Sequence, residues 1–150
     1  MKFKVLNTKQ KNNFYKNYFI KFGLSEILKN KNFSKRSINQ MKVNNPYEPE
    51  LDDLYLLHSY IIKYKRMTVL EFGTGWSTLV MANAIKYNMK KNFSKIKNLR
   101  LNNAGQVYTL DNEKKWLNET KKKTIKYSKE VKFHYSESVM DCFNGKICTS

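Results

Sequence analysis

The sequence predicts an α/β fold built around a parallel sheet. Three short segments rich in β-branched and aromatic residues, at 67–72, 106–110 and 131–135, have the length and composition of buried strands. Helical patterns separate them, and a strand–helix–strand order implies right-handed crossovers between parallel strands. At 150 residues, with 41% hydrophobic residues, the chain is long enough for one domain with a substantial core.

Residues 1–45 are expected to form a basic helical extension. Glu26 is their only acidic residue, against eleven lysines and arginines. Aromatic residues three and four positions apart predict one amphipathic helix over about residues 10–29. We expect its aromatic stripe to pack on the main domain, the alternative being a helix that binds a membrane surface or nucleic acid.

The main domain is expected to span residues 46–150, after a turn-rich segment at 44–49 that contains both prolines. Acids at the start and bases at the end of 50–65 suit the helix dipole and predict a helix there. His58 on this helix is expected to be a packed core residue rather than a catalytic one.

The remaining elements follow in alternation. Ser77 and Thr78 can cap a helix that ends near Asn88. Residues 90–103 form a basic, asparagine-rich insertion without clear periodicity. A further helix is predicted from Glu113 to about Lys126.

The loop after the first predicted strand carries the chemical signal. Gly73 and Gly75 let the backbone turn sharply and approach a ligand, and the following helix N-terminus offers free amides. The dinucleotide pattern Gly-x-Gly-x-x-Gly is only partly met, because Thr78 replaces its third glycine. The Glu71 carboxylate would repel a pyrophosphate but would suit a ligand with an amino group and a sulfonium.

This segment resembles the first signature motif of class I S-adenosylmethionine-dependent methyltransferases, Glu/Asp-x-Gly-x-Gly-x-Gly, with serine at the last position. The resemblance implies a Rossmann-like parallel sheet and S-adenosylmethionine as cofactor. The residues that it implies for cofactor binding in this loop are Glu71, Phe72, Gly73, Thr74, Gly75 and Ser77.

Two later segments extend the resemblance. Asp111 ends the second strand, where the family has an acid that hydrogen-bonds both ribose hydroxyls, and Asn112 follows it. Asp111 stands forty positions after Glu71 rather than the usual ~20, with 90–103 as the apparent insertion. Glu137, after the third strand, matches an acid near the adenine amino group; the alternative is a solvated loop carboxylate.

The resemblance covers about residues 50–150 and implies an incomplete sheet. The family has seven strands and three are visible before Ser150, so we expect a chain truncated after the third strand. The fold expected is therefore an incomplete Rossmann-like sheet with a helical N-terminal extension. The sequence identifies no catalytic residue and no methyl acceptor.

Charge and cysteines complete the expectations. The net charge of +17 is typical of nucleic-acid binding, but only three of the 29 basic residues are arginine and asparagine is abundant, which favours biased codon usage. Two cysteines form no disulfide framework and no zinc-ligand spacing. With no signal peptide and no membrane-spanning run, we expect a cytoplasmic protein without metal. The alternatives are a Rossmann-type NAD-binding enzyme and a basic RNA-binding or RNA-modifying protein.

Overall fold

Three parallel strands form the central sheet of the computed structural model, which describes residues 8–29, 49–96, 104–137, 140–143 and 146–149. The strands are β1 (Thr68–Phe72), β2 (Gln106–Asp111) and β3 (Val131–Tyr135), in the order β1-β2-β3. Their registers run in parallel, with Thr68 opposite Gln106 and Val107 opposite Val131. The predicted α/β class and parallel sheet are confirmed.

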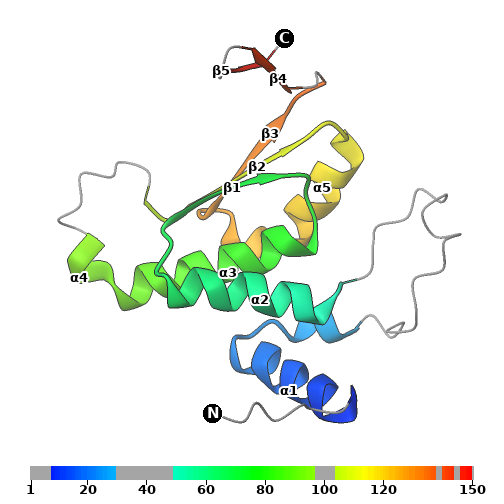
Figure 1. Cartoon of the computed structure of the whole chain (residues 1–150), viewed down its shortest axis with the longest axis vertical. Helices are drawn as coiled ribbons and strands as arrows, with labels where there is room; N and C mark the ends of the chain where they lie inside the picture. Colours follow the sequence, from blue (N-terminus) through cyan, green and yellow to red (C-terminus); the bar gives the residue numbers. More distant parts are fainter. Residues whose placement is uncertain (1–7, 30–48, 97–103, 138–139, 144–145, 150) are drawn as a thin grey trace, which may run out of the picture.

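The helices lie in layers on one side of this sheet (Figure 1). Helices α3 (Trp76–Lys91) and α5 (Lys114–Lys123) connect successive strands and pack on the sheet, α2 (Leu51–Lys63) packs on α3, and α1 (Thr8–Lys21) packs on α2. Right-handed crossovers that add each strand in the same direction leave the connecting helices on the same face. The short helices are η1 (Ser25–Lys29), α4 (Phe93–Ile96) and η3 (Ile125–Tyr127).

The core lies between the sheet and α2, and α3 occupies its centre. Leu79, Val80 and Ile85 of α3 are fully buried, because α3 has the sheet on one side and α2 on the other. Phe19 and Ile27 of the N-terminal segment are equally buried in the same cluster. The expected packing of the aromatic stripe of α1 onto the rest of the protein is therefore observed.

The expectation that 67–72 is a buried strand is wrong. Burial alternates along β1, and Leu70 and Phe72 are 61% and 62% exposed. Because the helices lie on one side of the sheet (Figure 1), the exposure of these two side chains places them on the other side. Val69 and Glu71 lie on the opposite face, toward α3, and are partly buried.

Several helices begin or end at residues other than those predicted. The helix expected over 10–29 ends at Lys21, because Gly23 adopts a left-handed φ of +69° that stops an α-helix, and η1 follows. The helix predicted at 50–65 is confirmed as α2. Helix α3 continues past Asn88 to Lys91, and α4 lies within the insertion at 90–103, where the sequence has no clear periodicity.

Two elements were not predicted. Strands β4 (Met140–Phe143) and β5 (Lys146–Thr149) form an antiparallel pair separate from the main sheet. The signal for them was in the sequence, since Asn-Gly between two short apolar segments is a strong hairpin indicator. The linker at 44–48, the insertion residues 97–103 and Ser138 lie outside the described residues. No helix in the described ranges is long and apolar enough to cross a membrane.

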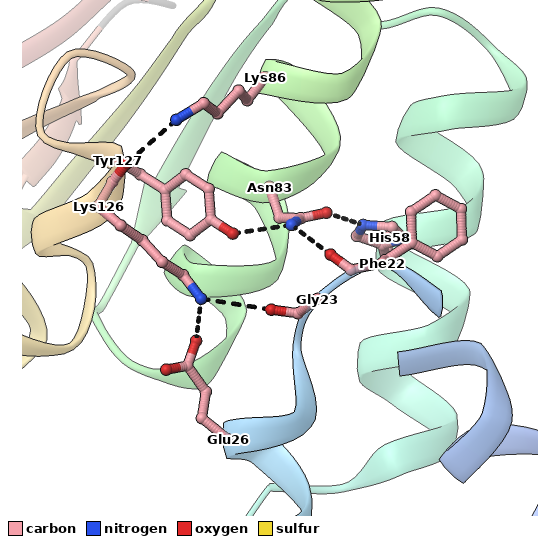
Figure 2. Close-up of polar contacts among 8 residues, drawn as sticks. All are labelled: Phe22, Gly23, Glu26, His58, Asn83, Lys86, Lys126 and Tyr127. Atoms are coloured by element: carbon pink, nitrogen blue, oxygen red, sulfur yellow. Dashed lines mark hydrogen bonds and ion pairs between the residues drawn. The ribbon is translucent and has the colours of Figure 1, made fainter. Parts of the chain in front are cut away.

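A polar network joins the N-terminal segment to α2, α3 and η3 (Figure 2). Asn83 of α3 is its centre: its Nδ2 donates to the Phe22 carbonyl at 2.9 Å and to the Tyr127 hydroxyl at 2.8 Å, and its Oδ1 lies 2.8 Å from His58 Nε2. On the same side, Lys126 Nζ lies 2.7 Å from Glu26 Oε1 and 3.4 Å from the Gly23 carbonyl. Four elements far apart in the sequence thus share one set of hydrogen bonds.

His58 is fully buried within this network, as expected of a core histidine. Its Nε2 faces the Asn83 carbonyl oxygen and its Nδ1 lies 2.8 Å from the Tyr18 hydroxyl. A neutral imidazole satisfies both contacts, with Nε2 donating and Nδ1 accepting. Burial lowers the pKa of His58 below 6.5, and the hydrogen bond to Asn83 offsets only part of this effect.

The buried neutral His58 predicts a loss of stability in mild acid. Below pH 6.5 His58 becomes protonated in the unfolded chain, whereas in the folded chain it stays neutral until the pH reaches its lowered pKa. The free energy of unfolding therefore falls as the pH drops toward that pKa. We expect His58→Gln to flatten this fall below pH 6.5, measured by urea unfolding at each pH. His134→Gln, at an exposed position of β3, is the matched control. Equal flattening in both variants would contradict the assignment.

Candidate functional site

The carboxyl ends of the three parallel strands meet at one edge of the sheet, and every residue predicted to bind a cofactor lies there. Ligands of open α/β sheets bind at this edge. The peptide N–H of Ser136, just beyond β3, donates to the Asp111 carbonyl at 3.2 Å and ties the ends of β2 and β3 together. The predicted residues at this edge are Glu71, Phe72, Gly73, Thr74, Gly75, Ser77, Asp111, Asn112 and Glu137.

The loop between β1 and α3 begins with Gly73, whose φ is +90°. Side-chain-bearing residues rarely adopt this conformation, so glycine is required here. The Gly73 N–H donates to the Leu110 carbonyl at 2.7 Å, and the Gly73 carbonyl accepts from the Thr109 hydroxyl at 3.0 Å. Both bonds come from β2, which therefore fixes where the loop leaves the sheet.

Helix α3 begins two residues earlier than expected. Gly75 occupies the N-cap position and Trp76 is the first helical residue, so the prediction that Ser77 caps the helix is wrong. Thr78 instead accepts a hydrogen bond from the Gly75 N–H through its hydroxyl at 3.0 Å. A side chain at this third position that reaches back to the N-cap amide forms half of a capping box.

The Glu71 carboxylate is directed into the start of α3. Its Oε1 accepts a short hydrogen bond from the Ser77 hydroxyl, and its Oε2 accepts from the Thr78 hydroxyl at 2.6 Å. Burial raises the pKa of Glu71 above 4.5, while hydrogen bonds from nearby hydroxyls offset part of the rise. Glu71 therefore holds the loop and the first helical turn together as a partly buried acid.

Asp111 holds the same loop from the neighbouring strand. Its Oδ2 accepts from the Thr74 N–H at 2.8 Å and from the Thr74 hydroxyl at 3.0 Å, and its Oδ1 accepts from the Glu113 N–H at 2.9 Å. A carboxylate has about four acceptor sites, so these three bonds leave about one, on Oδ1, for a ligand. One ribose hydroxyl can bind without breaking a bond, and a second would have to displace Thr74.

The remaining predicted residues are exposed. Glu137 accepts from the Tyr135 hydroxyl at 2.8 Å and lies 3.8 Å from Lys114 Nζ, which sits 4.4 Å from the centre of the Tyr135 ring. Asn112 is exposed beside Asp111, and Phe72 lies on the open face of the sheet. Exposed polar and aromatic groups therefore also lie at this edge of the sheet.

Two residues of this site, Thr109 and Lys114, were not singled out from the sequence. Thr78 was predicted as a helix cap, but its hydrogen bond to Glu71 was not predicted. Thr109 could have been recognised from its place on the inward face of β2. The position of Lys114 beside Glu137 depends on how α5 packs.

The charge at this edge is unusual for so basic a chain. Four of the twelve acidic residues, Glu71, Asp111, Glu113 and Glu137, lie at or just after the strand ends. The N–H groups of Thr74 and Gly75, which would face a phosphate, already donate to Asp111 and Thr78. Such an edge suits a ligand with cationic groups better than a pyrophosphate. No group of three or more metal-binding side chains occurs among the described residues.

Comparison with known proteins found no matching family model, no matching curated protein and no matching solved structure.

The partly buried Glu71 predicts a second pH dependence. Between pH 4.5 and its raised pKa the folded chain holds a proton that the unfolded chain has lost, so the contribution of Glu71 to stability is complete below pH 4.5 and is lost as the pH rises through the raised pKa. We expect the difference in unfolding free energy between the wild type and Glu71→Gln to shrink over this window. Glu137→Gln, at an exposed site, is the control. A difference that grows with pH would show that Glu71 is stabilised as a carboxylate.

Proposed function

We propose that this chain binds S-adenosylmethionine at the carboxyl edge of its sheet, as the cofactor-binding part of a Rossmann-like class I methyltransferase. The observation that carries the proposal is the loop Gly73–Ser77, placed between β1 and α3 and held by the acids of two adjacent strands. The sequence of this loop resembles the first motif of that family. The order of the parallel strands and the crossover helices on one face support the same assignment.

Charge favours this cofactor over a dinucleotide. S-adenosylmethionine carries a sulfonium and an amino group, whereas NAD carries a pyrophosphate. A pyrophosphate here would face the acids of the strand ends and would find the amides of Thr74 and Gly75 already bonded.

The residues at the edge suit different parts of the cofactor. Asp111 has an acceptor site for a ribose hydroxyl, and Asn112 is exposed next to it. Glu137, just after β3, and Lys114, at the start of α5, form an ion pair that would lie beside the adenine ring. The cofactor supplies an already activated methyl group, so the protein has mainly to hold and orient it.

Ligand titration tests the proposal. We expect isothermal titration to give binding of S-adenosylmethionine and S-adenosylhomocysteine and none of NAD at equal concentrations. Adenosine lacks the amino-acid half of the cofactor, so it tests what that half contributes to binding. It should bind more weakly because it has no cationic groups for the acidic side chains to attract. Binding of NAD with no response to the adenosyl sulfur compounds would contradict the proposal.

Substitutions at the edge test the ribose contact. A hydrogen bond to a charged acceptor is worth roughly 1.5–3 kcal/mol, so Asp111→Ala should weaken S-adenosylhomocysteine binding about tenfold or more. Glu137→Ala should cost less, because its carboxylate is exposed to solvent.

A third variant separates direct binding from support of the loop. Thr74→Val removes one donor from Asp111 and leaves the acceptor site on Oδ1 intact. The affinity of Thr74→Val for S-adenosylhomocysteine should equal or exceed that of the wild type. A loss at Thr74→Val equal to that at Asp111→Ala would show that Asp111 acts only through the loop, and an equal loss at Glu137→Ala would remove the ribose assignment.

A further inference from the structure

The C-terminal end of α2 carries an exposed aromatic pair at the opposite edge of the sheet from the candidate site. Tyr60 and Tyr64 lie one helical turn apart, their ring centres are 4.4 Å apart, and they are 52% and 49% exposed. Helix α2 ends here at Lys63, and four residues separate it from the start of β1 at Thr68 (Figure 1). Exposed tyrosines on adjacent turns offer flat surfaces on which another ring can stack.

Basic side chains lie beside Tyr64. Lys63 Nζ lies 5.2 Å and the Arg66 guanidinium 5.9 Å from the centre of the Tyr64 ring, and Lys65 stands between them in the sequence. All three are exposed. The acids of α2, Asp52 and Asp53, lie in its first turn, about 16 Å along the helix axis from Tyr64. Positive charge is therefore concentrated at the aromatic end of the helix.

The turn that carries these residues is held rigidly. Lys65 has a φ of +51°, the left-handed conformation that glycine usually supplies after a helix. The Arg66 N–H donates to the Ile61 carbonyl at 3.0 Å, and the buried Asn88 amide donates to the carbonyls of Ile61 and Arg66 at 2.9 and 3.0 Å. A lysine in this strained position, where glycine is usual, adds a third positive charge to the turn. The fixed backbone lowers the entropy lost when a ligand binds.

We propose that this surface, the tyrosine platform of Tyr60, Lys63, Tyr64, Lys65 and Arg66, binds single-stranded nucleic acid. An unpaired base stacks on the exposed tyrosines, and the three cations contact the phosphates that flank it. Aromatic surfaces with adjacent positive charge are the usual means of binding single strands without sequence preference. The platform lies away from Gly73–Ser77, so its test is independent of cofactor binding.

The experiment measures binding of a fluorescent single-stranded oligouridylate of about 12 nucleotides, a length within known single-strand site sizes, by anisotropy at several salt concentrations. The double variant Tyr60→Ala/Tyr64→Ala should lose about tenfold or more in affinity with the salt dependence unchanged. Tyr60→Phe/Tyr64→Phe, which keeps the rings, should bind like the wild type. Thermal unfolding of each variant verifies that the fold is kept.

Charge variants test the phosphate contacts. Lys63→Gln/Lys65→Gln/Arg66→Gln should reduce affinity and lower the slope of log K against log salt by about 2, since each phosphate contact contributes roughly 0.7 for single strands. Lys9→Gln/Lys11→Gln/Lys16→Gln removes the same charge from exposed positions of α1 and is the control. Equal effects of the two triple variants would overturn the proposal, because they would indicate attraction by net charge alone.

Two further arms exclude other partners. Leu56 is 61% exposed one turn before Tyr60 but has no ring, so Leu56→Ala should leave binding unchanged. A loss at Leu56→Ala equal to that of the alanine double variant would indicate a generic apolar surface and overturn the proposal. So would equal sensitivity of duplex binding to the tyrosine substitutions, because paired bases cannot stack on the platform. Binding to anionic vesicles without binding to the single strand would assign the surface to membranes instead.

Discussion

The bonds that hold the loop Gly73–Ser77 determine the geometry of the whole carboxyl edge. Asp111 at the end of β2 accepts from both the N–H and the hydroxyl of Thr74, and Glu71 on β1 accepts from the hydroxyls of Ser77 and Thr78. Adjacent parallel strands bring these two acids to the same edge, and each acid fixes a different end of the loop. The N-terminus of α3, and with it the packing of α3 against the sheet, follows from these contacts.

The main free-energy cost of this arrangement is the partial desolvation of Glu71. Its carboxylate is withdrawn from water and its pKa is raised, and two hydroxyl groups supply hydrogen bonds in place of water. Asp111 satisfies three of its acceptor sites at the surface of the protein. In our proposal Glu71 only positions the loop, through its bonds to Ser77 and Thr78, whereas Asp111 both positions the loop and binds the cofactor.

A second polar network holds the outer layers. Helix α3 is nearly surrounded, and Asn83 on it bonds to groups from the N-terminal segment, α2 and η3 (Figure 2). Buried polar groups with specific partners restrict how helices can pack, because a shifted helix would leave them unpaired. The N-terminal segment therefore shares the core and the polar contacts of the rest of the protein.

Local chemistry explains what the sequence could predict. The strands, α2 and the glycine loop follow from short-range patterns, and a parallel sheet then places Glu71 and Asp111 at one edge. The partners of these acids were not predictable, because Thr74 and Asp111 are 37 positions apart and their contact depends on strand register. The exposure of Leu70 and Phe72 depends on which face the helices cover. Gly23 ends α1 through its left-handed backbone conformation. The glycine was visible in the sequence, but the aromatic periodicity continued past it and predicted a longer helix.

The most direct test of the account is to locate the ligand on the protein. Two-dimensional NMR of the ¹⁵N-labelled chain, titrated with S-adenosylhomocysteine, reports each backbone amide separately. The account predicts shifts concentrated at Gly73, Thr74, Gly75 and Asn112, with Gly105 at the opposite edge unchanged. Shifts at the opposite edge, with the loop amides unmoved, would contradict it.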